Sequence, residues 1–131
     1  MSTNIETARR YLQALESGAS GERLAAFFHP DVIQQEFPNR LVPQGKTRNL
    51  RELHESAERG QKVLESQRYE VHTAVADGDQ VALELEWTGT LKIALGTLPA
   101  GATMRARCAT FLTFREGRIL SQRSYDCFEP F

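Results

Sequence analysis

The N-terminal part of the chain places apolar side chains at the spacing of amphipathic helices. In the first segment, the apolar positions that recur every three or four residues are Ile5, Ala8, Tyr11, Leu12 and Leu15. Thr3 followed by Glu6 has the form of a capping box, and Ser17-Gly18 is a stop signal. These signals predict one amphipathic helix between them.

Two further helices are predicted. The shorter one follows a Ser20 cap and should end at His29-Pro30, because the residue before a proline disfavours the helical region. Asn49 is predicted to cap the third helix, whose apolar face also contains Gly60. A glycine there suggests that another element packs closely against the helix backbone. The other residues of that face are Leu50, Leu53, Ala57 and Leu64.

From Gln67 onward, apolar side chains alternate with polar ones, which is the period of a half-buried strand. The segment Asp77-Gly78-Asp79 is predicted to form a three-residue turn. This turn predicts the cross-strand pairs Tyr69–Trp87, Val71–Leu85 and Val75–Val81. Further strands are predicted over residues 31–37, 102–114 and 119–128, the last two joined across Glu116-Gly117.

Helices followed by long strands with one apolar face predict an α+β fold. The N-terminal helices should pack on one side of a strongly curved antiparallel sheet. Strands of ten or more residues twist and bend, often at bulges. A bent sheet wrapped on helices can enclose a concave space, so the pattern predicts one small-molecule pocket.

Composition narrows the class of protein. The 131 residues are 40% apolar and 25% charged, which is typical of one globular domain. A net charge of −1 argues against nucleic acid as a partner. No apolar run approaches the ~20 residues of a membrane span, and the N-terminus lacks a signal-peptide pattern. Two cysteines are too few for a disulfide framework, so we expect a cytoplasmic protein.

Three segments carry a family resemblance that covers essentially the whole chain. They are Phe28-His29-Pro30-Asp31-Val32, the turn Gly117-Arg118-Ile119 and the ending Tyr125-Asp126-Cys127-Phe128. With the order of elements, they resemble the nuclear transport factor 2-like superfamily and, within it, the SnoaL-like proteins. The resemblance implies a single cystatin-like cone or roll over residues 1–131. It implies no one reaction, because the superfamily includes isomerases, epoxide hydrolases, cyclases, dehydratases and non-catalytic members.

Asp126 and Tyr125 on the last strand are candidate catalytic residues. The resemblance to SnoaL-like cyclases implies that a final-strand Asp is the acid/base group. A carboxyl among apolar side chains has a raised pKa and can transfer protons at neutral pH. Alternation along the strand argues the other way, because a two-residue turn at Glu116-Gly117 places Arg107 opposite Asp126 and turns Tyr125 to the apolar face. Only a bulge would turn Asp126 inward.

Glu36 is the third candidate catalytic residue, since it lies in an apolar segment before a Pro38 corner. A second pocket carboxyl with a different pKa would complete an acid/base pair. The alternative is a salt bridge to Arg40 or to a nearby loop arginine. Asn39 and Arg40 could orient a substrate carbonyl, although turn geometry alone also favours Asn at such a corner.

The remaining candidates would form the wall of the pocket. His54 borders the apolar stripe of the third helix, whereas His29 and His72 read as structural or exposed. Cys108 reads as a small core or wall residue, and no pair of residues has metal-ligand spacing, so neither a metal nor a cofactor is expected. The aromatic candidates for the wall are Phe28, Phe37, Tyr69, Trp87 and Phe111.

Three functions are open on these observations. The first is a cofactor-free acid/base enzyme, of isomerase, cyclase, dehydratase or hydrolase type, acting on a small hydrophobic molecule. The second is a module that binds such a molecule without turnover. The third is a dimerisation domain. A homodimer is implied by the resemblance, and the mixed charge of the outer strand face, which carries Arg68, Glu70, His72, Glu84 and Glu86, permits it.

Overall fold

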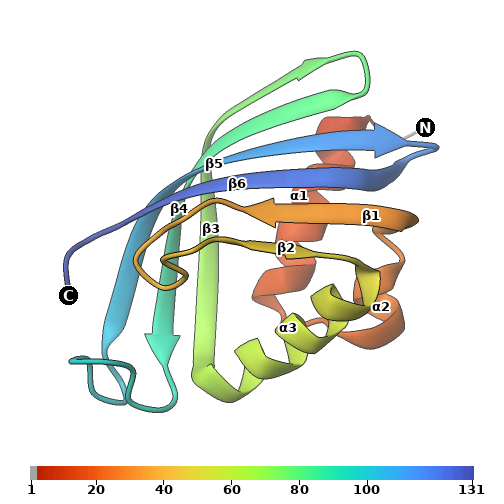
Figure 1. Ribbon diagram of the computed structural model, residues 1–131. Coiled ribbons are helices and arrows are strands. Elements are labelled where there is room, and N and C mark those ends of the chain that lie inside the picture. Colours follow the sequence, from red (N-terminus) through yellow and green to blue (C-terminus); the bar gives the residue numbers. More distant parts are fainter. Residues whose placement is uncertain (1–2) are drawn as a thin grey trace.

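The computed structural model describes residues 3–131 as three helices packed on one face of a six-stranded sheet (Figure 1). The helices are α1 (Asn4–Glu16), α2 (Gly21–Ala25) and α3 (Leu50–Val63). The strands are β1 (Phe28–Glu36), β2 (Lys46–Arg48), β3 (Leu64–Asp77), β4 (Gln80–Leu91), β5 (Thr103–Arg115) and β6 (Arg118–Phe128). Their order across the sheet is β2-β1-β6-β5-β4-β3.

Capping boxes begin the two long helices, at the predicted caps Thr3 and Asn49. In α1, the Thr3 hydroxyl accepts from the Glu6 N–H at 3.1 Å, and the Glu6 carboxylate accepts from the Thr3 N–H at 3.1 Å. Asn49 and Glu52 form the same reciprocal pair in α3. Each pair satisfies N–H groups that have no partner within the helix. None of the helices within residues 3–131 combines the length and the apolar character that crossing a bilayer requires.

The α+β class and the packing of helices on a curved sheet are confirmed. The long strands β4 and β5 bend strongly along their length (Figure 1). All neighbouring strands are antiparallel except β1 and β6, which run parallel. The sheet is therefore mixed.

The parallel pairing also corrects the predicted end of the second helix. That helix ends at Ala25, and His29 and Pro30 lie in β1. Strand β1 begins early because Phe28 pairs with Ile119 of β6. Pro30, which has no N–H to donate, falls in the irregular stretch of this pairing, where its missing donor is tolerated.

The β3–β4 hairpin differs from the prediction by one bulge. The pairs Tyr69–Trp87 and Val71–Leu85 form as predicted, but Val75 lies opposite Ala82 instead of Val81. The turn has two residues, Gly78 and Asp79, because Asp77 pairs with Gln80. The extra residue His72 in β3 restores the predicted register closer to the helices.

The core lies where α1 crosses the inner face of the sheet. Tyr11 and Leu12 of α1 are 3% and 5% exposed, and they join a cluster of buried strand residues. The strand members of this cluster are Phe28, Val32, Val81, Leu83, Leu85, Leu112, Phe114 and Ile119. The cluster fills the end of the sheet near the β5–β6 turn and leaves the other end to a cavity.

Two glycines have opposite surroundings. A Cβ atom at Gly60 of α3 would meet no atom within 4 Å, so the predicted close packing there is wrong and the helix faces open space. A Cβ atom at Gly89 of β4 would instead lie 2.5 Å from Cζ2 of Trp87. Gly89 therefore allows the indole ring to lie flat against the strand.

We expect Gly89→Ala to lower the free energy of unfolding by about 1–3 kcal/mol, because the added methyl group collides with the Trp87 ring. Gly60→Ala is the matched control, and it should raise stability by roughly 0.5–1 kcal/mol because alanine favours the helix. Urea unfolding followed by circular dichroism measures both. Equal stability of the Gly89→Ala variant and the wild type would contradict the crowding at Trp87.

Candidate functional site

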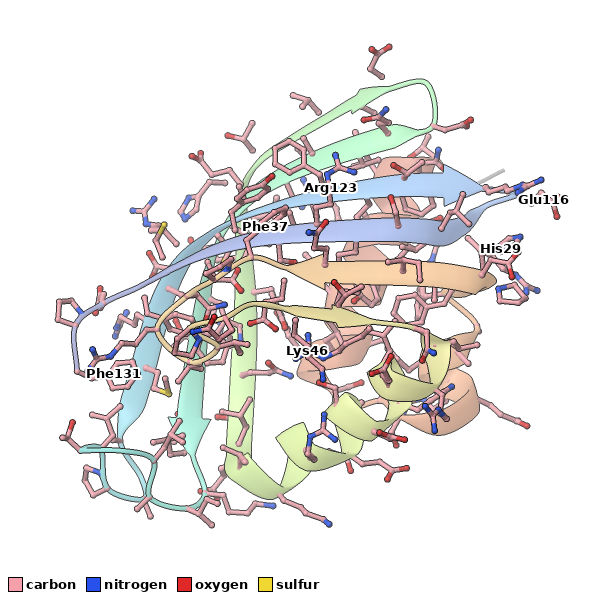
Figure 2. All side chains as sticks on the ribbon, in the orientation of Figure 1. His29, Phe37, Lys46, Glu116, Arg123 and Phe131 are labelled. Carbon is pink, nitrogen blue, oxygen red and sulfur yellow. The ribbon has the colours of Figure 1, made fainter. Side chains whose placement is uncertain are left out.

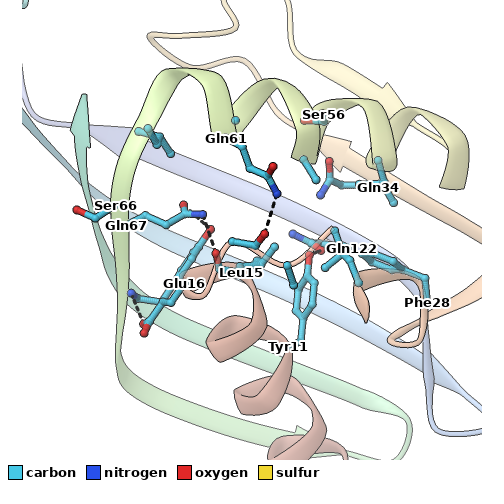
Figure 3. Close-up of a pocket in the computed structure, with 18 of the residues that line it drawn as sticks. Tyr11, Leu15, Glu16, Phe28, Gln34, Ser56, Gln61, Ser66, Gln67 and Gln122 are labelled. Atoms are coloured by element: carbon cyan, nitrogen blue, oxygen red, sulfur yellow. Dashed lines mark hydrogen bonds between the residues drawn. The ribbon is translucent and has the colours of Figure 1, made fainter. Parts of the chain in front are cut away.

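A cavity with two adjoining chambers lies between the inner face of the sheet and helices α1 and α3. The Asp126 chamber, of about 340 Å³, is lined by residues of all six strands and contains Asp126 in its lining. The helix chamber, of about 280 Å³, extends between α1 and α3 (Figure 3). Residues that line both chambers are Tyr11, Leu15, Gln34, Ser56, Leu64, Gln67, Tyr69 and Gln122.

A β-bulge in β6 determines which residues of the last strand face the cavity. Phe114 pairs with Ile119, but Thr113 pairs with Ser121, so Leu120 is an extra residue in β6. Beyond the bulge, Asp126 lies opposite Cys108, not opposite Arg107 as the unbulged register predicted. Asp126 therefore lines the cavity together with Cys108.

The same bulge turns Tyr125 to the outer face of the sheet, where it is 43% exposed. Its ring stacks on Phe37 with centroids 4.4 Å apart and meets Phe111 edge-on at 5.9 Å. The Arg123 guanidinium lies 5.5 Å from the Phe111 ring centroid, and both Arg123 and Phe37 are labelled in Figure 2. The predictions that Tyr125, Phe37 and Phe111 contribute to the pocket are therefore wrong, because strand alternation places all three on the other face.

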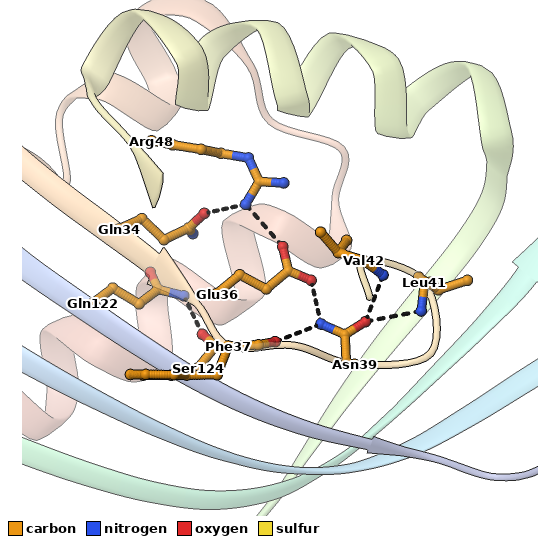
Figure 4. A network of polar contacts seen from close by, with 9 residues as sticks. All are labelled: Gln34, Glu36, Phe37, Asn39, Leu41, Val42, Arg48, Gln122 and Ser124. Carbon is orange, nitrogen blue, oxygen red and sulfur yellow. Dashed lines mark hydrogen bonds and ion pairs between the residues drawn. The ribbon is translucent and has the colours of Figure 1, made fainter. Parts of the chain in front are cut away.

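Glu36 lines the Asp126 chamber as part of a bonded network (Figure 4). Its Oε1 accepts from Nη1 of Arg48 at 2.8 Å, and its Oε2 accepts from Nδ2 of Asn39 at 2.9 Å. The Arg48 and Glu36 side chains are only 11% and 18% exposed. The partner of Glu36 is thus Arg48 of β2, not Arg40. With both oxygens occupied, Glu36 is suited to holding Arg48 in place.

Three other residues predicted to line the pocket, Asn39, Arg40 and His54, do not line the cavity. The Asn39 carbonyl Oδ1 accepts from the N–H groups of Leu41 and Val42, so this side chain stabilises the turn. Arg40 is exposed, donates to the Phe131 carbonyl oxygen and lies over the Phe131 ring. His54 of α3 borders neither chamber. These three residues are therefore not wall residues.

Tyr69, Trp87 and Cys108 line the Asp126 chamber, and Phe28 lines the helix chamber, in agreement with their predicted positions. Sequence reasoning missed Gln67, which fixes two of them. Its Oε1 accepts from the Trp87 indole N–H at 2.9 Å and from the Tyr69 hydroxyl at 3.3 Å. Alternation along the strand could have predicted this role, because Gln67 lies two residues before Tyr69 and therefore on the same side of β3.

Sequence reasoning also missed the polar side of the cavity on β6. The Tyr11 hydroxyl donates to Oε1 of Gln122 at 2.8 Å, and Nε2 of Gln122 donates to the Ser124 hydroxyl at 3.2 Å. Gln122 and Ser124 share the inward side of β6 with Asp126, two residues apart. Once the bulge is known, alternation along β6 predicts all three.

Burial and charge keep Asp126 in its protonated form to higher pH than usual. Removal from water raises the pKa of Asp126, the nearby negative charge of Glu36 raises it further, and a hydrogen bond from the Cys108 thiol opposes both effects. Burial and then the Asp126 carboxylate raise the pKa of Cys108, so the thiol persists at neutral pH and is a poor nucleophile. Burial likewise raises the pKa of Tyr69, which keeps its hydroxyl a donor.

Within the described part of the chain, residues 3–131, no group of three or more His, Cys, Asp or Glu side chains is arranged to hold a metal ion. Arg48 is the cation in the lining of the Asp126 chamber, and its Nε is buried without a hydrogen-bond partner among the described residues. Besides the donors already engaged, the chamber lining therefore contains the Arg48 guanidinium, the Asp126 carboxyl and the aromatic rings of Trp87 and Phe128.

The raised pKa of Asp126 predicts a pH-dependent stability. A carboxyl with a higher pKa in the folded than in the unfolded state stabilises the fold below the unfolded value of about 3.9, and this contribution is lost as the pH rises through the folded value. Asp126→Asn should therefore become more stable relative to wild type between pH 4 and pH 7, by about 1.4 kcal/mol per unit of pKa elevation. Urea unfolding at several pH values measures the free energy of unfolding of both proteins. A difference between Asp126→Asn and wild type that does not change with pH would contradict the prediction.

Comparison with known proteins agrees with this architecture. IdmH of Streptomyces antibioticus, a proposed polyketide cyclase, is 22% identical with a TM-score of 0.79, over 95% of this chain and 92% of that protein. A SnoaL-like polyketide cyclase of Agrobacterium tumefaciens is 21% identical with a TM-score of 0.71, over 96% and 92% of the two chains. A Xanthomonas campestris protein with a cystatin-like fold is 20% identical with a TM-score of 0.71, over 95% and 91%.

At these identities the solved structures establish the shared fold and leave the reaction open. No curated protein matches the chain. The family model of the SnoaL-like domain matches residues 8–122, which contain most of α1, the cavity-lining helix α3 and most of the sheet. The chain therefore belongs to the SnoaL-like domain family, as the sequence resemblance indicated.

Proposed function

We propose that this protein is a cofactor-independent acid/base enzyme that acts on a small, largely apolar carbonyl compound, in a reaction of the polyketide-cyclase type. The observation that carries the proposal is Asp126, a largely buried carboxyl of raised pKa that lines the cavity. A raised pKa brings a carboxyl closer to the optimum for a group that transfers protons near neutral pH.

In the proposed reaction, ionised Asp126 accepts a proton from the carbon next to a substrate carbonyl. The resulting enolate attacks a second carbonyl of the same molecule, and the protonated carboxyl then returns the proton to the new alkoxide. One residue thus serves as base and as acid, and no proton is gained or lost overall. Ring closure of this kind requires the substrate to be held in a folded conformation.

The developing negative charge on the carbonyl oxygen needs hydrogen-bond donors. Tyr125, a candidate catalytic residue, and Asn39, a candidate for orienting a substrate carbonyl, do not line the cavity. Tyr69 is the better candidate, because it lines the same chamber as Asp126 and the hydrogen bond from its hydroxyl to Gln67 is long, at 3.3 Å. A long bond of this kind is easily exchanged for a shorter one to an oxyanion.

The apolar part of the chamber lining, next to Asp126 on the sheet, suits the carbon skeleton of such a substrate. Trp87 meets Phe128 edge-on with ring centroids 5.9 Å apart, and Leu85 and Ala106 lie beside them in the lining. Trp87 is held by Gln67, so its ring presents a fixed apolar surface. An aromatic or alicyclic ring packed there would place its oxygen atoms toward the polar side.

A second possibility is that the chamber binds its ligand without turnover. Neighbours named as polyketide cyclases favour the enzyme. Trp87 is the sole tryptophan of the chain and lines the Asp126 chamber, so its fluorescence reports on binding independently of catalysis. Binding without any Asp126-dependent reaction would identify the protein as a binding module.

The enzyme proposal predicts that Asp126→Asn lowers kcat about 10²–10⁴-fold on a substrate found by screening small aryl ketones and polyketones, because the amide cannot transfer the proton. Tyr125→Phe is the matched control on the neighbouring residue of the same strand. It should leave turnover unchanged, since its hydroxyl lies on the outer face. Equal turnover by the wild type and Asp126→Asn would remove Asp126 from the mechanism.

We also propose that the protein is a homodimer formed through the outer face of the sheet. No helix of the described chain covers this face (Figure 1), and Ile33 and Tyr125 are 47% and 43% exposed on it. Beside them, Glu86 lies 3.8 Å from Arg105 and 3.4 Å from Arg107. An apolar patch next to charges of both signs can pair with a second copy of itself.

Sedimentation velocity tests the dimer. The wild type should sediment as a dimer, and the combined substitutions Ile33→Glu and Tyr125→Glu should give a monomer by placing like charges in the interface. Ile93→Glu, at a residue 50% exposed in the segment after β4, should remain dimeric. A monomeric wild type, or a double variant that stays dimeric, would contradict the proposal.

A further inference from the structure

The helix chamber lies outside the acid/base step and has a different lining. It adjoins the Asp126 chamber along Gln34, Ser56 and Tyr69, but Asp126 and Arg48 belong only to the other chamber. Figure 3 shows Gln34 and Ser56 on one side of this space and Tyr11 with Gln122 on another. The helix chamber thus contacts the site of the proposed chemistry and extends away from it between α1 and α3.

Most polar groups of this lining are already bonded to one another. Gln67 accepts two hydrogen bonds and donates to the Leu15 carbonyl at 3.1 Å. Gln122 accepts from Tyr11 and donates to Ser124. Because these amides need no further partner, a ligand can lie against them without supplying charge or many hydrogen bonds.

The charged residues of the lining are acidic and lie at its rim. Glu16 and Glu65 are both exposed, and Glu16 accepts from the Tyr69 backbone N–H at 2.7 Å. No lysine, arginine or histidine belongs to this lining among the described residues. An anionic group in the helix chamber would therefore meet two carboxylates and no compensating cation.

Apolar side chains supply the remaining lining, and a missing side chain keeps the space open. The apolar members from α1, α2, α3 and β1 include Leu15, Leu24, Phe28, Leu53 and Ala57. Gly60 of α3 also lines this chamber, and a Cβ atom there would meet nothing within 4 Å. A larger residue at Gly60 would extend into the chamber without displacing backbone.

Volume supports the use of both chambers by one molecule. Pockets for small organic ligands measure about 300–1,000 Å³. The Asp126 chamber, at about 340 Å³, lies at the lower end of this range, and the helix chamber, at about 280 Å³, lies just below it. Together they accommodate an elongated molecule that neither could hold alone.

We infer that the helix chamber is a second subsite, which binds an uncharged, mainly apolar tail of the substrate while the carbonyl-bearing head lies against Asp126 and Trp87. This inference rests on the proposed function for the position of the head. Ser56 and Gln34, which belong to both linings, stand where head and tail join and can donate to an oxygen atom at that junction. The substrate class is therefore an elongated, uncharged aryl or alicyclic ketone.

A chain-length series tests the subsite. The probes are 2-acylnaphthalenes with acyl chains of two to eight carbons, and their Kd values are measured from the fluorescence of Trp87 and checked by calorimetry. In the wild type, Kd should fall about two- to fourfold for each added methylene until the chamber is full, which is the range expected for burial of a CH₂ group. In Gly60→Leu, Kd should no longer fall with acyl chain length, while the two-carbon probe should bind as in the wild type.

Arg59→Leu is the matched control, because it adds the same side chain one position away on the exposed side of α3. This variant should show the same fall in Kd with increasing acyl chain length as the wild type. Thermal unfolding confirms that each variant is folded, and Gly60→Met, whose flexible side chain enters the same space, replaces Gly60→Leu if that variant does not fold.

The outcomes separate the subsite from the proposed function. A chain-length gain that persists in the folded Gly60 variants, or an equal loss of affinity for short and long probes, overturns the second subsite and leaves the Asp126 chamber as a binding site. Failure of the wild type to bind any acylnaphthalene overturns the proposed function, and the subsite falls with it.

Discussion

The extra residue in β6 controls the chemistry of the cavity. Side chains alternate across a strand, so a one-residue shift exchanges the whole set that faces inward. With Leu120 bulged, Ile119 still faces the core near the turn, and Asp126 faces the cavity at the far end. Without the bulge, the inward position would belong to Tyr125. One β6 strand thus serves the packed core at its beginning and a polar site at its end.

The properties of Asp126 follow from this placement. The sheet and α1 remove the carboxyl from bulk water, which raises its pKa, while Glu36 adds a negative charge nearby. Arg48 is bound to Glu36 instead, so the one cation of the Asp126 lining does not lower the pKa of Asp126 through a direct ion pair. The short strand β2 matters for this reason, since it holds Arg48 on the Glu36 side of the chamber.

Local patterns in the sequence predicted much of this fold. The Thr3–Glu6 capping box placed the start of α1, and the Asn49 cap placed the start of α3. Alternation placed Tyr69 opposite Trp87 in the wall of the Asp126 chamber. Non-local features could not be predicted in this way. The parallel β1–β6 pair and the Arg48–Glu36 contact join segments through the sheet, and no local period reports them. The bulge that turns Asp126 inward breaks the alternation on which strand reasoning depends.

Titration of the Asp126 side chain tests its inward orientation most directly. Carbon-13 NMR of protein labelled at aspartate Cγ resolves each carboxyl, and the resonance missing in Asp126→Asn identifies this one. We predict a pKa clearly above the ordinary aspartate value of 3.8, which moves closer to that value in Glu36→Gln because the neighbouring charge is removed. A pKa at or below 3.8 would mean that Asp126 is solvated or ion-paired, and it would contradict the inward orientation that the bulge provides.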